Sequence, residues 1–259
     1  QIHQSGLDVI LDAQKKLSRT QEELASGKRL LTPADDPVAT AQIQSIRNEL
    51  SRIETMQSNI SRASSELAMV EDSVANVEGL LMRARELAVR GANDSLSLQD
   101  REIIATEIDA LREQLIAAAN TQSSDGDYIY AGYAVSAAPY TDATVNATYA
   151  GDTGVRAINI APGLTVNTRF AGEAVFGQGS AATGQLNAFE ALAVLSAGLR
   201  GNASEAITSL TNNGNAVTQD EAINISMQAL DTNLETVRSV RTQLGVRMNR
   251  VDDQQALNA

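Results

Sequence analysis

The chain has 259 residues, no cysteine and a formal net charge of −12. Its length is enough to bury a substantial core in one or two domains. The acidic balance argues against nucleic acid as a partner, because phosphates would repel the chain, and the lack of cysteine excludes disulfides and thiolate metal sites. No run of about 20 apolar residues occurs, so the sequence predicts no membrane-spanning helix.

The first expected helix covers residues 7–26. Its heptad positions are Ile10, Leu17 and Leu24, and Gly27 follows as a C-terminal stop. This pattern is already under way near the start of a chain that does not begin with Met, so we expect the native protein to extend further. The first residues also lack the basic start and apolar middle of a signal peptide.

The next segment carries the most informative pattern in the chain. Apolar residues stand one heptad apart at Ile46, Ile53, Ile60, Leu67, Val74, Leu81 and Ala88. Two turns of α-helix take about seven residues, so these side chains lie along one seam. Asp36 is the expected N-cap and Pro37 the first helical residue. The segment predicts one helix of about 50 residues ending near Arg90, far longer than the mean of about 11–12 residues, with its seam packed against other helices.

A turn at residues 91–95 separates this helix from a third, which we expect to end near Thr121. Ser97 and Asp100 form a capping box at its start, with Asp in place of the usual Glu. The short connection favours an antiparallel arrangement of the second and third helices.

The middle of the chain changes character. All eight aromatic residues lie between Tyr128 and Phe189, and aromatic side chains favour β structure. We expect strand-like structure to open at residues 128–130, and a hairpin whose turn is formed by residues 161–163. Residues 128–184 are therefore predicted to form a small β-rich insertion.

Helices return after the insertion. We expect one over residues 186–199, a short one over residues 202–210, and a final helix of about 35 residues that begins with a capping box of Thr218 and Glu221. The expected fold class is mainly α: an elongated antiparallel bundle of long helices. Residues 1–127 and 185–259 would form this discontinuous rod domain, and residues 128–184 the small inserted domain.

Patterns that would carry chemistry are weak. His3 is the only histidine, which argues against a catalytic triad and a histidine zinc site. Asp35 and Asp36 are better explained as helix-capping acids than as paired catalytic carboxylates, because a proline follows directly. The five tyrosines between Tyr128 and Tyr149 fit a sheet core better than a sugar-binding surface. We therefore expect no catalytic, cofactor-binding or metal-binding residues.

Several motifs resemble those of the flagellin superfamily. Near the N-terminus these are Leu24–Leu30 and Asp35–Pro37, and in the middle Asp127–Gly132. Near the C-terminus they are Arg241, Leu244–Gly245, Arg247 and Asn249–Arg250. The setting of the two prolines at positions 33 and 37 is closer to the hook-associated junction proteins of this superfamily than to its filament flagellins.

The resemblance implies a structural protein of the bacterial flagellum, not an enzyme, placed where the hook meets the filament. It would be exported through the flagellar type III apparatus without a cleaved signal. Its partners would be the preceding hook-associated junction protein, flagellin, an export chaperone and copies of itself, with no nucleic acid or membrane partner. The candidate subunit-interface or structural residues are Lys28, Arg29, Asp35, Asp36, Arg241, Arg247, Asn249 and Arg250.

Two alternatives remain open. The chain could be a short filament flagellin, or, less favoured, a carbohydrate-binding module built on the β-rich insertion, which would need a groove of exposed tyrosines. The resemblance also implies that most of the terminal segments that drive assembly are missing, so we expect a monomer in solution.

Overall fold

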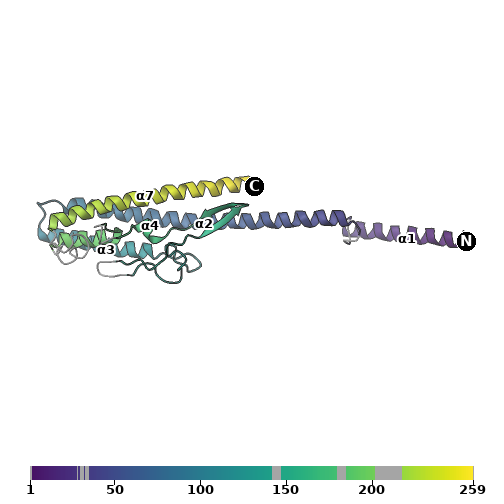
Figure 1. Cartoon of the computed structure of the whole chain (residues 1–259), viewed down its shortest axis with the longest axis horizontal. Helices are drawn as coiled ribbons and strands as arrows, with labels where there is room; N and C mark the ends of the chain where they lie inside the picture. The colour runs from purple at the N-terminus through teal and green to yellow at the C-terminus, as the bar shows by residue number, and fades with distance from the viewer. Residues whose placement is uncertain are drawn as a thin grey trace. The chain divides into compact units, whose positions relative to one another are not determined.

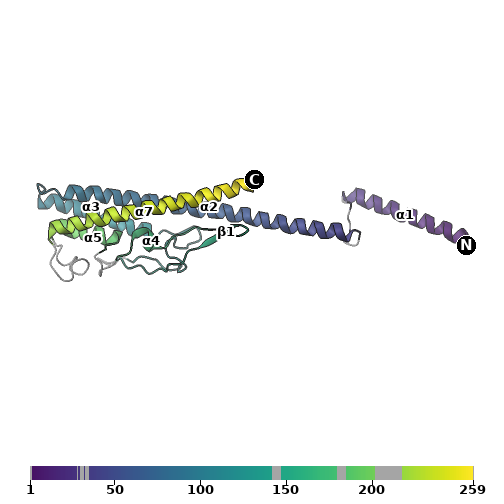
Figure 2. The same ribbon diagram turned by 45° about the horizontal axis from the view of Figure 1, so that its top comes forward.

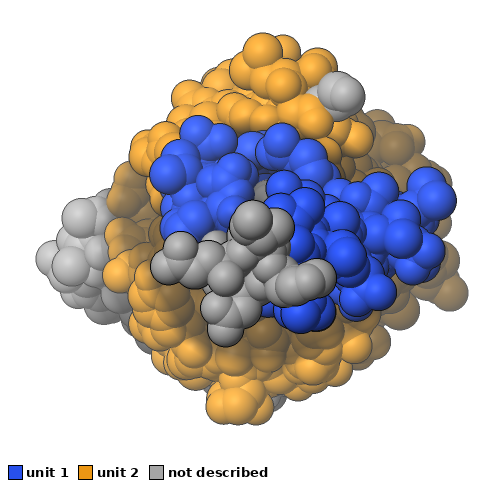
Figure 3. All heavy atoms as spheres, turned by 90° about the vertical axis from the view of Figure 1, so that its right-hand side faces the viewer, with its two compact units in different colours: residues 1–55 blue, residues 56–259 orange. Residues whose placement is uncertain are grey.

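The computed structural model describes residues 2–27, 29, 32, 35–141, 147–179, 185–201 and 218–258. The chain divides into two compact units, residues 1–55 (unit 1) and residues 56–259 (unit 2), which Figure 3 colours separately. The predicted short helix over residues 202–210 lies outside the described residues. These units do not correspond to the rod domain and inserted domain that the sequence predicts. That division remains a prediction.

Unit 1 contains helix α1 (Ile2–Ser26) and the first part of helix α2 (Pro37–Gly91). Helix α1 ends at Gly27, whose φ of 65° lies in the left-handed region that glycine adopts without strain. Helix α2 is continuous over 55 residues, as its heptad pattern predicts. Its N-cap is Asp36, whose Oδ1 accepts the backbone N–H of Ala39 at 3.0 Å.

Unit 2 is a bundle of α2 from Met56 onward with helices α3 (Leu98–Ala119), α5 (Ala188–Leu199) and α7 (Gln219–Leu257). Helix α5 packs against both α3 and α7, and α7 runs alongside α2 in both ribbon views (Figures 1 and 2). Residues that lie later along α2 form their polar contacts with residues that lie earlier along the C-terminal segment. The two helices are therefore antiparallel.

Helix starts in unit 2 follow the predicted capping chemistry. Ser97 and Asp100 form the expected capping box at the start of α3. At the start of α7, the hydroxyl of Thr218 accepts the N–H of Glu221 at 3.3 Å, which is one of the two bonds of the predicted box. A further box at the start of α5, built by Asn187 with Glu190, was not predicted. Each cap satisfies backbone donors that the first helical turn leaves without partners.

The insertion contains one antiparallel hairpin, formed by β1 (Ala157–Ala161) and β2 (Leu164–Asn167), with Ile158 opposite Val166. Gly163 in its turn has φ 76°. This hairpin was predicted, but the expected strand at residues 128–130 is wrong. There the backbone makes an isolated bridge and then bonds to several separate segments, because the aromatic side chains are placed by burial and not by strand pairing. The short helix α4 (Gly172–Phe176) was also missed.

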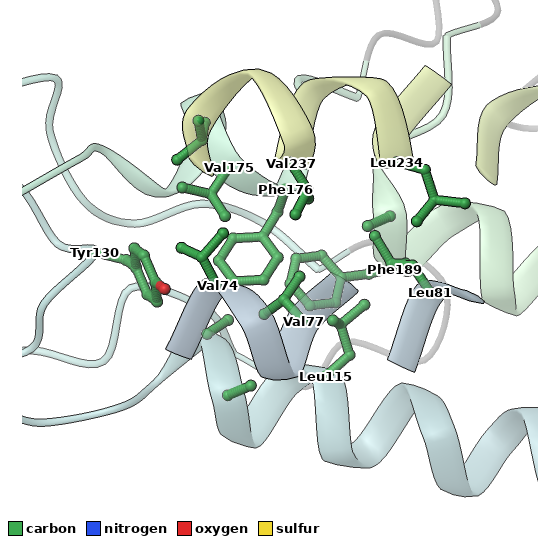
Figure 4. Packing of buried hydrophobic residues seen from close by; sticks show 14 of the residues in the cluster. Val74, Val77, Leu81, Leu115, Tyr130, Val175, Phe176, Phe189, Leu234 and Val237 are labelled. Atoms are coloured by element: carbon green, nitrogen blue, oxygen red, sulfur yellow. The ribbon is translucent and has the colours of Figure 1, made fainter. Parts of the chain in front are cut away.

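The insertion and the bundle share one hydrophobic core (Figure 4). The ring centroids of Tyr130 and Phe176 lie 5.2 Å apart, and Phe176 stacks on Phe189 of α5 at 5.2 Å. Val74 of α2 and Val237 of α7 belong to the same cluster. The inserted segment is therefore held by the same core that holds the helices together.

Candidate assembly surface

The heptad seam of α2 changes environment along its length. Ile60 is 2% exposed, and the later seam positions are buried with it. Ile46 and Ile53 in unit 1 are 68% and 38% exposed, and Leu50 beside them is 55% exposed. The expectation that the whole seam packs within the chain is therefore wrong for its first part.

The change coincides with the last turn of α7. The side chain of Gln57 donates a hydrogen bond to the carbonyl of Asn258 at 3.1 Å, so the last turn of α7 lies beside residue 57. Described residues of the chain cover the seam only from that point onward. Helix α1 likewise exposes its heptad positions Ile10, Leu17 and Leu24. Rows of large apolar side chains left in water mark interaction surfaces.

The predicted N-terminal site residues lie around the link between α1 and α2. Lys28 lies outside the described residues, and Arg29 is exposed. Asp35 accepts the N–H of Thr32 at 2.9 Å and pairs with Arg19 of α1 at 3.1 Å. With Asp36 capping α2, both acids have structural contacts within unit 1.

Arg241 belongs to a row of ion pairs between α2 and α7. Its guanidinium reaches Glu71 at 2.6 Å and Glu78 at 2.8 Å, and Arg238 donates to Glu78 at 3.0 Å. Arg85 pairs with Asp231 further along. Hydrogen bonds from Arg241, then from Arg238, hold the pKa of Glu78 below its ordinary value.

Sequence reasoning missed most of this row, although a signal was present. Glu71, Glu78 and Arg85 stand one heptad apart beside the apolar seam of α2. Charged residues at such flanking positions of paired helices commonly form interhelical salt bridges. The spacing marks one side of the row, but nothing in it identifies the partners on α7.

Arg247 contacts the inserted segment. Its guanidinium lies 4.0 Å from the ring centroid of Phe170, and its Nη1 donates to the carbonyl of Asn167 at 3.1 Å. Burial lowers the pKa of Arg247. Asn249 and Arg250 on the same helix are exposed. The candidate residues are thus divided between the two units, and four of them have clear contacts within the chain.

The tyrosines do not form the groove that a sugar-binding module would need. Tyr130 and Tyr140 are buried, and burial raises the pKa of both hydroxyls. The hydroxyl of Tyr149 donates to backbone carbonyls, whereas Tyr133 is 68% exposed. Within the described ranges, Tyr133 is the one largely exposed tyrosine, which leaves the carbohydrate alternative without its required surface.

The described residues include neither a metal-binding cluster nor a membrane-spanning helix. Among them, no group of three or more histidine or acidic side chains is placed to hold a metal ion. No helix in the described part of the chain combines the length and apolar character needed to span a bilayer.

Comparisons with known proteins place this geometry in context. The family model described as the bacterial flagellin N-terminal helical region matches residues 2–135. Flagellar hook-associated protein 3 of Escherichia coli strain K12 is 31% identical over 143 residues, which are 54% of this chain and 44% of that protein. A flagellin of Listeria innocua is 29% identical over 201 residues, 76% of this chain and 65% of that protein.

The chain therefore spans about half the length of its hook-associated relative. Among solved structures, flagellar hook-associated protein 3 from Legionella pneumophila superposes with a TM-score of 0.71 at 19% identity, covering 83% of this chain and 94% of that one. At that level of identity the likeness shows a shared fold.

Proposed function

Since the chain belongs to the flagellin family, we propose that it is a structural subunit of the bacterial flagellum that connects the hook to the filament. The observation that carries this proposal is the division of the α2 seam. A subunit that buries most of the seam of a stiff helix in its own core and exposes the rest can join neighbouring subunits without unfolding. The hook-associated relative, together with Pro37 in its motif, favours the junction over the filament.

The mechanical role follows from the contacts of unit 2. Ion pairs at three successive heptads of α2 attach it to α7, and the apolar seam lies beside them. Such a pair of packed antiparallel helices resists bending better than one helix alone, and it can transmit torque along its axis.

The remaining parts of the proposal concern partners and location. We propose contacts with the preceding hook-associated protein, with flagellin and with copies of the chain, binding by an export chaperone, and type III export without a cleaved signal. Arg29, Asn249 and Arg250 are the candidate residues free to make subunit contacts, since they are exposed. We propose no catalytic activity, in keeping with the structural proteins that the chain resembles.

Deleting the gene in the source bacterium tests this function. We expect cells that carry hooks without filaments and release flagellin into the medium, because filament subunits would lack the surface on which to assemble. Supplying the full-length gene on a plasmid should restore filaments. Normal filaments on the deletion strain would contradict the junction role.

The second candidate is a short filament flagellin. One observation favours it: the similarity to the Listeria flagellin extends over more of the chain than the similarity to the hook-associated relative. Purified full-length protein would then polymerise alone into long filaments, seen by negative-stain electron microscopy. The junction proposal expects no such polymer, and expects the protein to bind at the ends of isolated hooks instead.

A further inference from the structure

A hollow in unit 2 beside the end of the hairpin contains two arginines with too few acids near them. Its volume is about 440 Å³, and its lining includes Arg169, Phe170 and Arg247. Arg247 comes from α7, whereas Arg169 and Phe170 lie shortly after the end of β2. We call this hollow the Arg247 socket.

The guanidinium of Arg247 is held in place without an acid. It stacks over Phe170, and its Nη1 donates to the carbonyls of Asn167 at 3.1 Å and Arg169 at 3.5 Å. Among the described residues, no carboxylate pairs with it, and its Nε and Nη2 have no hydrogen-bond acceptor. Its plane is thus fixed while its strongest binding groups remain available.

Other arginines of unit 2 show the contrast. Hydrogen bonds and charge interactions with carboxylates raise the pKa values of Arg83, Arg85 and Arg241. Burial alone acts on Arg247, and it lowers the pKa. The desolvation of this partly buried cation is therefore offset by neutral contacts only, and not by an anionic partner.

Arg169 is the second group of the socket and is 3% exposed. Its Nη2 lies 3.4 Å from Oδ2 of Asp127, and Arg156 approaches the same oxygen at 3.5 Å. One carboxylate thus serves two arginines. The Nη1 of Arg169 is buried and has no hydrogen-bond partner within the described part of the chain. An unsatisfied buried donor on a charged group destabilises the fold, so an incoming acceptor would be favourable there.

The local charge balance is positive. Glu173 also lines the socket, but its carboxylate accepts a hydrogen bond from Gln178 at 2.8 Å, and it pairs with neither socket arginine among the described residues. Two arginines and one acid therefore line the socket, within a chain that carries a formal net charge of −12. A basic site in an acidic protein is complementary to the surface of another acidic subunit.

We propose that the Arg247 socket receives a side-chain carboxylate from an acidic segment of a neighbouring subunit. A guanidinium presents its N–H groups as a planar fork that matches the two oxygens of a carboxylate, and the stacking on Phe170 orients this fork in advance. A second copy of this chain has suitable chemistry, since its 32 acidic residues outnumber its 20 basic ones. The inference rests on the proposed function in one respect, because assembly of the flagellum must place a neighbouring subunit next to the socket.

Titration of the isolated chain with a hexaglutamate peptide tests the socket. The Nε–H resonance of Arg247, followed by nuclear magnetic resonance, should shift saturably as peptide is added. Arg247→Gln should abolish binding, and Arg169→Gln should weaken it about tenfold or more. Arg90→Gln is the matched control, because Arg90 is an exposed arginine of α2 that does not line the socket, and it should bind like the wild type.

A loss of fold in Arg247→Gln would be seen in its circular dichroism melt. In that case Arg247→Lys is the variant that tests the proposal. It keeps the positive charge but lacks the planar N–H fork, so we expect it to bind the peptide about tenfold more weakly than the wild type.

Three results would overturn the proposal: an Arg247 resonance unmoved at millimolar peptide, equal losses in Arg90→Gln and Arg247→Gln, or tighter binding of inorganic phosphate than of peptide, which indicates a small-anion site. Because the titration needs no flagellum, its outcome is separate from that of the deletion experiment. Peptide binding combined with normal filaments on the deletion strain would leave the socket standing and remove the junction role.

Discussion

Glu78 is a buried carboxylate on α2 that accepts hydrogen bonds from two arginines of α7. Its neighbours in the row, Glu71 and Asp231, are more exposed, so water screens their pairs more strongly. Among the ion pairs between α2 and α7, those of Glu78 therefore contribute most to holding α7 against α2.

Replacing Glu78 with Gln tests this contribution. The amide keeps the shape but loses the charge, so two charge-assisted hydrogen bonds weaken. We expect the free energy of unfolding of unit 2 to fall by about 1–3 kcal/mol, measured by urea denaturation followed by circular dichroism. Glu113→Gln on the exposed face of α3 is the control and should change little. Equal stabilities of wild type and Glu78→Gln would show that the row contributes nothing.

The same pair of proteins predicts a pH dependence. The pKa of Glu78 is lower in the folded state than its ordinary value, so its stabilising effect is fully present above the unfolded-state pKa of about 4.3. It is lost as the pH falls through the folded-state pKa, because protonation removes the charge. The stability difference between wild type and Glu78→Gln should therefore be constant near pH 7 and shrink below about pH 4. A difference that grows on acidification would contradict this assignment.

At the scale of elements, the sequence predicts most helices well. Heptad spacing alone indicates α2 as one continuous helix, and Asp36 and Ser97 mark helix starts where the structure has them. These signals are local. The wrong strand at residues 128–130 shows the limit, since Tyr130 and its neighbours are placed by a core built from distant segments. The partial burial of the α2 seam likewise depends on which segments pack against each part of α2 after folding.

Matched substitutions along the α2 seam test this division. Leu67 is fully buried, so Leu67→Asp should lower the free energy of unfolding by about 4 kcal/mol or more, through lost packing and a buried charge. Ile46 occupies the same heptad position and is exposed. Ile46→Asp should therefore cost less than about 1 kcal/mol. Urea denaturation compares the two variants, and similar losses would refute the division of the seam.

At the scale of the whole molecule, the candidate residues separate into two kinds. Motif resemblance selected Arg241 and Arg247 equally with Asn249 and Arg250, yet the first two have clear contacts within the chain and the others are exposed. Sequence spacing cannot make this distinction, because it depends on which segments face each residue after folding. The socket could not be predicted for the same reason, since Arg169 and Arg247 are brought together only by the packing of the hairpin against α7.

The exposed seam of unit 1 gives the prediction that belongs to the whole assembly. The triple substitution Ile46→Ser, Leu50→Ser, Ile53→Ser removes apolar area that the isolated chain leaves in water, so its melting temperature should stay close to that of the wild type. In cells that lack the native gene, the full-length variant should restore few or no filaments, because each apolar side chain buried against a neighbour contributes about 1.5–3 kcal/mol.

The matched control for this variant lies on the same stretch of α2. Arg47 and Glu54 are exposed and stand one heptad apart, and replacing both with Gln leaves the net charge unchanged. This control should support normal filaments, counted by electron microscopy alongside the triple variant. Secretion of both proteins into the medium, checked by immunoblotting, separates a failure of assembly from a failure of export. Normal filaments with the triple variant would mean that the exposed first part of the seam is not an assembly surface, and the flagellar role would then have to rest on the exposed residues of α7.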